Sequence, residues 1–320
     1  MRRRIVLAYT GSLQTSMAIR ALAEVDGTEV VTLTLDLGQG RDLEEVRDRA
    51  LATGAVRAHV LDVREEFARD FVLPALRVGA MREGRHPLGE ALAWPLVATK
   101  LVDIASVERA AAVAHGCTGG DEERMSKCVA ALDPQLEVIA AGCGDVAQRA
   151  HANLWGRAHA VIVPRVEAPD RAAYVEIVFE HGVPVAINGV PMPLTEVIES
   201  LSVIAGQHGI GWLHVGRPED GALRDRDYEA PAAVVLHAAR RALDAALIPA
   251  DLLRLKQDRA IGYAHLVTEG LWFTEGRQTM DALNVKMEEK VNGTVRITLF
   301  KGTLLTTELI GVGQDEVART

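Results

Sequence analysis

Residues 10–16, Thr-Gly-Ser-Leu-Gln-Thr-Ser, bring several hydroxyl side chains and a glycine together between an apolar run and a helical pattern. A turn that leads from a strand into a helix exposes backbone N–H groups at the positive end of the helix dipole, and such groups bind phosphate. Gln14 supplies no negative charge to oppose a phosphate-bound Mg²⁺. The segment predicts a site for a nucleotide or a related anion.

The first 140 residues alternate nearly continuous apolar runs with amphipathic helical patterns. This alternation predicts a doubly wound α/β fold, in which a parallel sheet is covered by helices on both faces. The turns at residues 10–16, 36–40 and 115–121 each follow a predicted strand. Because ligands of such sheets bind at the carboxyl ends of the strands, we expect these three turns to converge on one crevice.

The composition changes near residue 165. Beyond it the patterns predict a hairpin at 174–189, a helix at 194–209, a strand at 211–216, a polar loop at 217–230, helices across 231–290 and an antiparallel pair at 293–311. We therefore expect two domains. Residues 1–165 form a nucleotide-binding α/β domain, and residues 166–320 form an α+β domain for substrate binding or oligomerisation.

Bulk properties exclude several classes of function. The 320 residues carry a net charge of −9, which argues against a nucleic-acid or membrane-surface binder, since such proteins concentrate positive charge. No apolar run approaches the roughly 20 residues that span a bilayer, so a cytoplasmic location is expected. Three unpaired cysteines, Cys117, Cys128 and Cys143, indicate neither a disulfide framework nor a zinc site.

Several segments together resemble the argininosuccinate synthase family of N-type ATP pyrophosphatases. They include LAYTGSLQTS, TLDLGQGRDLEEVRDRAL, EGRHPLGEALAWPL, AVAHGCTGG, NLWGR, PVAING and DYEAP, in the family's order and spacing. The resemblance implies a sheet of the adenine nucleotide alpha hydrolase-like (HUP) type with a second α+β domain. That family uses ATP to adenylate the ureido oxygen of citrulline, and the amine of aspartate then displaces AMP.

The resemblance also implies which residues contact ATP. They are Ala8, Tyr9, Thr10, Gly11, Ser12, Gln14, Thr15, Ser16, Leu35, Asp36, Gln39, His115 and Gly116. Three of them depart from the family. Ser12 replaces a glycine, which permits unusual φ angles, Gln14 replaces an aspartate, and Leu35 replaces a small residue beside the adenine. Mg²⁺ is expected to arrive with ATP, because no protein cage for a metal is evident.

The substrate side departs further from the family. The third turn, HGCTGGDEERMSK, is two residues shorter, and its Asp121 and Arg124 align with family positions that contact the substrates, so both are candidate catalytic residues. Solvated charges at a helix start are the alternative reading of this pair. Most citrulline contacts are replaced. The candidate substrate-binding residues are Arg82, Glu90, Trp94, Thr118, Asp121, Arg124, Ala158, Arg224 and Tyr228. Tyr228 is the one citrulline contact that clearly matches the family.

We therefore predict an AMP-forming carbon–nitrogen ligase with altered substrate specificity, which uses ATP and Mg²⁺. A paralogue without catalysis, which binds or regulates a pathway partner, is one alternative. A sulfur-transfer enzyme using Cys117 and Cys143 is the other. The chain ends without the family's long C-terminal helix, so a homo-oligomer is expected as a dimer or a tetramer, with the dimer favoured.

Overall fold

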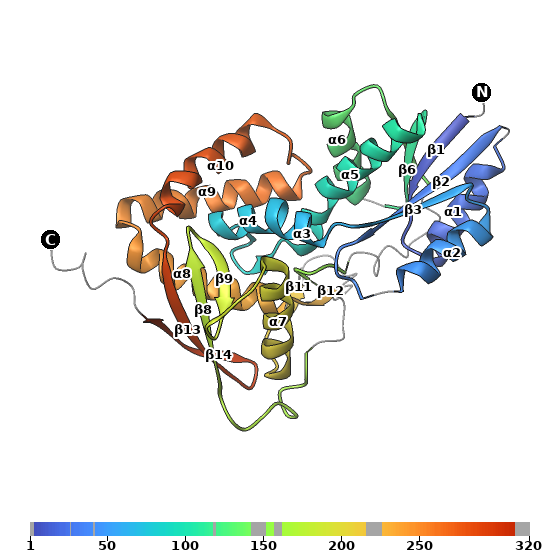
Figure 1. The fold of residues 1–320 in the computed structure, drawn as a ribbon. Coiled ribbons are helices and arrows are strands. Elements are labelled where there is room, and N and C mark those ends of the chain that lie inside the picture. Colours follow the sequence, from blue (N-terminus) through green and yellow to red (C-terminus); the bar gives the residue numbers. More distant parts are fainter. Residues whose placement is uncertain are drawn as a thin grey trace, which may run out of the picture. The chain divides into compact units, whose positions relative to one another are not determined.

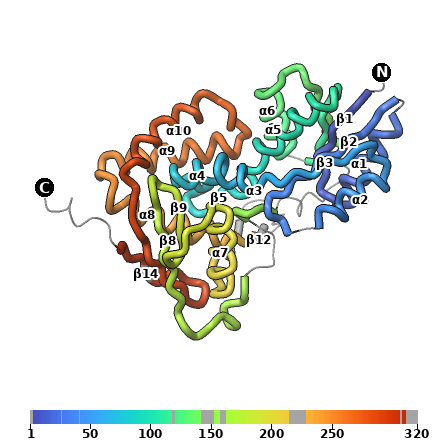
Figure 2. Tube along the Cα trace, in the orientation of Figure 1, coloured from blue at the N-terminus to red at the C-terminus, as the bar shows by residue number. Residues whose placement is uncertain are grey.

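The computed structural model describes residues 3–25, 27–40, 42–117, 120–141, 152–156, 162–215 and 226–310 (Figure 1). Two compact units share the chain, which passes between them several times. Figure 2 shows the same elements as a tube along the Cα trace, coloured by residue number. Unit 1 contains Met1–Phe67, Glu90–Asn153 and Leu266–Arg277. Unit 2 contains Ala68–Gly89, Leu154–His265 and Gln278–Thr320. The domain boundary between residues 165 and 166 stays a prediction.

Unit 1 is built on a five-stranded sheet. Its order is β3-β2-β1-β6-β7, and every pair is parallel. The strands are β1 (Arg3–Ala8), β2 (Thr28–Asp36), β3 (Arg57–Asp62), β6 (Ala112–His115) and β7 (Glu137–Ala140). The predicted parallel sheet is thus confirmed. Because β1 has β2 on one side and β6 on the other, the chain reverses direction across the sheet at β1, which is where ligands of such folds bind.

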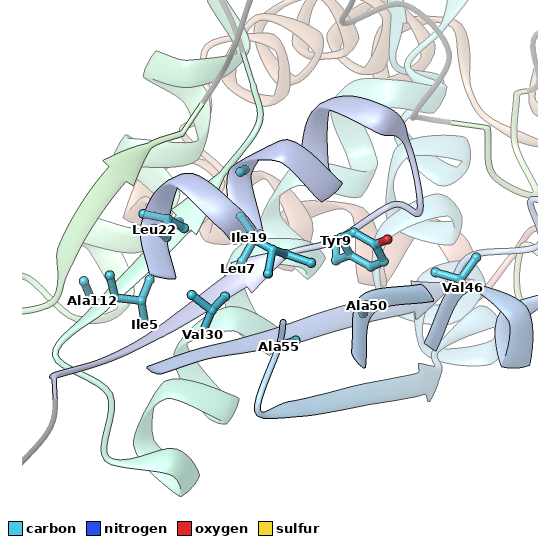
Figure 3. Packing of buried hydrophobic residues seen from close by; sticks show 12 residues of the cluster. Ile5, Leu7, Tyr9, Ile19, Leu22, Val30, Val46, Ala50, Ala55 and Ala112 are labelled. Carbon is cyan, nitrogen blue, oxygen red and sulfur yellow. The ribbon is translucent and has the colours of Figure 1, made fainter. Parts of the chain in front are cut away.

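The helices of this half follow strands, as the alternating pattern predicts. They are α1 (Leu13–Ala23), α2 (Leu43–Thr53), α3 (Arg64–Glu66), α5 (Gly89–Glu108) and α6 (Gly120–Leu132). A π-helix (Phe67–Val72) continues α3 and belongs to unit 2 from Ala68 on. Figure 3 shows Ile19 and Leu22 of α1 packed on Ile5 and Leu7 of β1. Val46 of α2 belongs to the same buried cluster. This packing fixes α1 and α2 on the sheet, and so fixes the turns that precede them.

A buried carboxylate ties the amino ends of two strands to the end of α5. Glu108 is 3% exposed. Its Oε1 accepts hydrogen bonds from Arg57 Nη1 at 2.7 Å and His59 Nε2 at 2.8 Å, and its Oε2 accepts one from Arg4 Nη1 at 3.1 Å. Burial raises the pKa of Glu108, but the bonds from His59 and Arg57 outweigh it, so the pKa lies below its ordinary value.

This carboxylate predicts a loss of stability in acid. Since the folded-state pKa is lower than the unfolded value, the contribution of Glu108 is complete above the unfolded value of 4.5 and disappears as pH falls through the folded pKa. Between about pH 5 and about pH 3, the urea midpoint of the wild type is expected to fall more than that of Glu108→Gln. Parallel pH profiles of the two proteins would contradict this assignment.

Unit 2 is centred on one antiparallel sheet of order β10-β9-β8-β13-β14. Its strands are β8 (Ala173–Glu180), β9 (Val183–Ile187), β10 (Val190–Pro191), β13 (Gly293–Phe300) and β14 (Thr303–Ile310). The predicted hairpin and the predicted C-terminal pair are confirmed, and the pairing of β8 with β13 joins them. The α+β class of this half is therefore confirmed.

The remaining elements of this half are helices and four short strands that pair outside this sheet. They are α4 (Leu73–Val78), β4 (Met81–Arg82), β5 (His86–Pro87), α7 (Leu194–Gln207), β11 (Trp212–Val215), β12 (Arg226–Glu229), α8 (Pro231–Leu247), α9 (Ala250–Thr268) and α10 (Glu275–Glu288). The loop predicted for residues 217–230 is wrong over 226–229, because β12 pairs there with β11. Its charged residues have weak strand propensity, and the pairing partner overrides it.

Four charged side chains form a buried ion cluster in unit 2. Arg240 is 1% exposed, and its Nε donates to Asp244 Oδ1 at 2.8 Å while its Nη2 donates to Glu288 Oε1 at 2.5 Å. Lys256 Nζ donates to Asp244 Oδ2 at 2.5 Å. The cluster joins α8, α9 and α10. Burial lowers the pKa of Lys256, and the nearby Arg240 lowers it further.

None of the helices that the structure describes is long and apolar enough to cross a membrane.

Candidate nucleotide site

The turn between β1 and α1 is shaped by its own hydroxyl groups. Ser12 caps α1: its Oγ accepts a hydrogen bond from the backbone N of Thr15 at 3.3 Å. Thr10 Oγ1 donates to Ser12 Oγ at 3.1 Å, and Ser16 Oγ donates to Ser12 O at 2.9 Å. The first turn of α1 carries no acidic side chain. The positive end of the helix dipole is therefore not neutralised from within α1, which favours an anion there.

Ser12 does not strain this turn. Its backbone is extended, with φ −75° and ψ 161°, which is ordinary for a capping serine. The backbone strain that the replacement of a glycine by Ser12 leads one to expect is therefore absent. The residue with the left-handed conformation is Gly11, at φ 74°. A Cβ atom on Gly11 would lie 2.9 Å from Val46 Cγ2, so both its φ and its surroundings require glycine.

Helix α2 holds the turn from the side, and the sequence did not indicate this. Arg49 Nη1 donates to the carbonyl oxygen of Gly11 at 2.8 Å, and its Nη2 pairs with Glu45 at 2.5 Å. Val46 and Arg49 are three residues apart, so they lie on one face of α2. That face supports Gly11 through an apolar contact and a hydrogen bond. No short sequence motif includes both α2 and Gly11, because Arg49 and Gly11 are 38 positions apart.

Removing Arg49 should loosen the turn. Arg49→Ala is expected to weaken the affinity for pyrophosphate about threefold, because one partly exposed hydrogen bond is lost. Arg47→Ala is the matched control, since Arg47 is 49% exposed in its side chain against 48% for Arg49 and pairs with its neighbour Asp48. Calorimetric titration measures both affinities. Equal affinities of the two variants would show that Arg49 does not position the turn.

The second turn closes on itself at the end of β2. Asp36 Oδ1 accepts a hydrogen bond from Gly38 N at 2.8 Å, and its Oδ2 lies 3.6 Å from Arg64 Nε. Gln39 bonds to the backbone on both sides of Asp36, with Nε2 donating to Leu35 O and Oε1 accepting from Leu37 N, each at 2.6 Å. The Leu35 residue is 9% exposed. These polar side chains thus determine the shape of the turn.

His115 ends β6, the neighbour of β1. Register Leu7↔Ala114 places His115 level with Ala8. Gly116 follows it, and a Cβ atom there would contact Thr15 Cγ2 at 3.4 Å, so the end of β6 lies against the first turn. Ala8 and Tyr9 complete the β1 end, and the hydroxyl of Tyr9 is 2.9 Å from Ser16 Oγ. The structure therefore brings the first turn and the β6 end together.

The imidazole of His115 has one nitrogen in a hydrogen bond and one without a partner in the part of the chain that the structure describes. Its Nδ1 accepts a hydrogen bond from Cys117 N at 3.2 Å, which assigns the ring proton to Nε2. The residue is 1% exposed, and Nε2 has no hydrogen-bond partner among the residues that the structure describes. Burial lowers the pKa of His115, although Glu122 opposes it, so the ring is neutral at pH 7. A buried N–H of this kind needs an acceptor.

The candidate catalytic pair lies in the first turn of α6. Arg124 Nη1 and Asp121 Oδ1 form an ion pair, and Arg124 Nε donates to the carbonyl oxygen of Thr268. The side chains are 30% and 14% exposed, so they are not freely solvated charges. Their charges neutralise each other within unit 1.

The substrate candidates fall in both units. Glu90 and Trp94 lie in the first two turns of α5 in unit 1, where Trp94 is buried. Arg82 and Tyr228 lie in β4 and β12 of unit 2. The hydroxyl of Tyr228 donates to Pro87 O at 3.2 Å, and burial raises its pKa. A pocket shared by these residues stays a prediction. Thr118, Ala158, Arg224 and Cys143 lie outside the described residues.

Within the described ranges, no three His, Cys, Asp or Glu side chains gather as a metal-binding group.

Gln14 is half-buried on the first turn of α1.

Comparison with known proteins identifies the family. Residues 4–161 match the model of the arginosuccinate synthase N-terminal HUP domain, and residues 139–308 match that of the arginosuccinate synthase C-terminal domain. Argininosuccinate synthase from Nitratidesulfovibrio vulgaris (strain DP4) is 38% identical over 343 residues, which cover 94% of this chain and 87% of that protein. The one from Symbiobacterium thermophilum is 40% identical, with 94% and 86% covered. The chain therefore belongs to the argininosuccinate synthase family, whose members are ATP-dependent ligases.

Proposed function

We propose that this chain is an AMP-forming carbon–nitrogen ligase that binds ATP at residues 8–16. The observation that carries the proposal is the buried Nε2–H of His115, which lacks a partner among the described residues at the end of the strand next to the phosphate turn. An anion at the amino end of α1 would offer the acceptor that this donor needs, and the turn would offer the anion its backbone N–H groups.

MgATP fits the residues of this turn. When bound, it would supply the adenylyl group, with pyrophosphate as the leaving group, and its own Mg²⁺, which usually keeps several waters and phosphate oxygens as ligands. The turn supplies backbone donors and the capping Ser12, and His115 supplies a neutral donor. Gln14 adds no charge, so the chain itself contributes little to holding the metal. We assign Asp121 and Arg124 a role in orienting the substrates, which is consistent with their partial exposure.

Altered specificity is the second part of the proposal. Arg82, Glu90, Trp94 and Ala158 replace the family residues that contact citrulline, and a polar pocket rejects a ligand that leaves its buried groups unpaired. In this structure the Tyr228 hydroxyl also has an internal partner, the Pro87 carbonyl. We therefore infer an amino-acid-like substrate other than citrulline. We also infer a cytoplasmic homo-oligomer, whose size light scattering measures.

Titration with MgATP, followed by assay of AMP and pyrophosphate with a panel of amine and ureido acceptors, tests the function. His115→Leu is expected to weaken MgATP binding about fivefold, because the bound phosphate loses a hydrogen-bond donor. His115→Gln keeps a side-chain donor and should recover part of the affinity. If the wild type neither binds MgATP nor forms AMP, the ligase proposal fails, and the alternative of a non-catalytic binding partner is favoured.

The sulfur-transfer alternative finds no support in unit 1. Burial raises the pKa of Cys117 to about 12, with Asp121 and Glu90 adding to the effect. A nucleophilic cysteine needs the opposite shift, since the thiolate is the reactive form. Cys143, the other cysteine of that hypothesis, lies outside the described residues.

A further inference from the structure

Helix α9 ends in a glycine motif that leaves a carbonyl oxygen for Arg124. The backbone N–H groups of Gly270 and Leu271 donate to carbonyl oxygens in the last turn of α9, at 3.2 and 2.8 Å. This is the Schellman pattern, in which a glycine in the left-handed region ends a helix, and Gly270 has φ 73°. The carbonyl of Thr268, the last residue of α9, lies outside this pattern. Its oxygen accepts the hydrogen bond from Arg124 Nε.

The end of α9 is a favourable place for a cation. The last carbonyl groups of a helix have no partners within it, and they lie at the negative end of its dipole. The Arg124 guanidinium meets this end of a helix of 19 residues. Its Nη1 pairs with Asp121 Oδ1. The protein therefore fixes two of the three guanidinium nitrogens.

The backbone of Gly270 also lies directly against that of Arg124. A Cβ atom on Gly270 would be 2.8 Å from Arg124 Cα and 2.9 Å from Arg124 O, which is closer than a Cβ atom packs against another segment. One turn further along α6, Cys128 Sγ donates to Gly270 O at 3.5 Å, and Cys128 is fully buried. Arg124 and Cys128 are four residues apart, so the end of α9 contacts one face of α6.

The third guanidinium nitrogen, Nη2, lies at the start of α6. A Cβ atom on Gly120, the first residue of α6, would be 3.8 Å from it. Among the residues that the structure describes, Arg124 bonds to Thr268 and Asp121 through its other two nitrogens. Helix α6 follows β6, so Nη2 lies at the carboxyl edge of the parallel sheet, where ligands of such folds bind. A guanidinium N–H in that place can donate to a carboxylate.

We propose that the end of α9, through Thr268 O and Gly270, positions Arg124 so that Nη2 donates to a carboxylate of the substrate. Gly270 is a positioning residue, because it contacts Arg124 and not the ligand. The inference rests on the proposed function, since it takes Arg124 to orient a substrate. An arginine side chain has many rotamers, and a guanidinium that is already fixed at two nitrogens loses less entropy when the third binds a ligand.

Calorimetric titrations of the full chain with L-aspartate, as a probe carboxylate, and with magnesium pyrophosphate test this. Gly270→Ala is expected to bind L-aspartate about fivefold more weakly than the wild type, because the new Cβ atom displaces Arg124. Its affinity for magnesium pyrophosphate should stay within about twofold.

Gly79→Ala is the matched control. Gly79 ends α4 with the same pair of backbone hydrogen bonds and has φ 78°. No atom of the described residues beyond its chain neighbours lies within 4 Å of its Cβ position. Gly79→Ala therefore carries the same backbone cost without the contact, and it should change neither affinity.

A double-mutant cycle separates positioning from a general structural role. Arg124→Ala should weaken L-aspartate binding about tenfold, because the charged donor is lost. Adding Gly270→Ala to that variant should have no further effect on the affinity, since Gly270 acts through Arg124. Additive effects of the two substitutions would overturn the inference, and so would an unchanged affinity of Gly270→Ala for L-aspartate.

The two ligands also separate the inference from the proposed function. Failure of the wild type to bind magnesium pyrophosphate defeats the proposed function, whereas failure to bind L-aspartate overturns the inference. An NMR measurement on the wild type covers a variant that does not fold. The Arg124 Nε–H proton should exchange slowly with water, because it is bonded to Thr268 O, and fast exchange would also overturn the inference.

Discussion

Gly11→Ala is expected to bind pyrophosphate about thirtyfold more weakly than the wild type, because the new Cβ atom adds about 2 kcal/mol of strain to the bound conformation. Two causes act together. Gly11 has φ 74°, where a side chain is unfavourable, and the Cβ atom would lie 2.9 Å from Val46 Cγ2. Relief of this strain would move the backbone N–H groups that the proposed site uses.

Two further variants separate these causes. Gly27 has the same φ of 74°, but no atom of the described residues beyond its chain neighbours lies within 4 Å of its Cβ position. The change in unfolding free energy of Gly27→Ala therefore reports the cost of the backbone conformation alone. Val46→Ala removes the methyl groups that the new Cβ would meet. The double variant Gly11→Ala/Val46→Ala should therefore regain part of the affinity. If Gly11→Ala binds pyrophosphate as tightly as the wild type, the turn is not the phosphate site.

Arg240→Ala is expected to lower the free energy of unfolding by about 3–5 kcal/mol, because it leaves two buried carboxylates, Asp244 and Glu288, with Lys256 as the remaining cation of the cluster. Arg240 bridges Asp244 and Glu288, and all three are at most 5% exposed. Its Nη1 also donates to Gly182 O at 3.3 Å, in the turn between β8 and β9. Loss of the guanidinium thus releases one sheet hairpin and two helices at once.

Urea unfolding monitored by circular dichroism measures this loss, and Arg241→Ala is its control. Arg241 is the next residue on α8 and is exposed, so the same truncation there should change the unfolding free energy by less than about 0.5 kcal/mol. Replacing Arg240, Asp244, Lys256 and Glu288 together by apolar residues should cost less than Arg240→Ala alone. A loss below about 1 kcal/mol for Arg240→Ala would mean that the cluster does not hold the helices together.

The α/β half could be predicted well because its signals are local. Almost continuous apolar strands alternate with amphipathic helices, and each buried strand carries its own pattern regardless of its partners. The turn at residues 10–16 was recognisable for the same reason, since a hydroxyl-rich cap and a glycine act within a few residues. The role of the two small residues was assigned less well. Gly11 bears the left-handed backbone, and Ser12 is an ordinary cap.

Contacts between distant segments could not be predicted. The hairpin around Ile177 joins the C-terminal pair through Val295, and β12 pairs with β11 although its residues are mostly charged. Arg49 reaches Gly11 across 38 positions. The strand pairings depend on which segments the connecting loops bring together, and the Arg49 contact depends on how α2 lies on the sheet. Residue patterns within a short segment predict neither.

The sequence by itself determined the class of the two halves, the family and the place of the hydroxyl-rich turn between β1 and α1, because apolar period, helix capping and motif spacing are properties of short segments. Tertiary structure decided what those segments do to one another. It placed Val46 and Arg49 against Gly11, left the Nε2–H of His115 buried without a partner among the described residues, and put the Gln39 amide on the backbone of β2. Burial is the physical reason, since only packing removes water from a polar group and so makes its remaining partners matter.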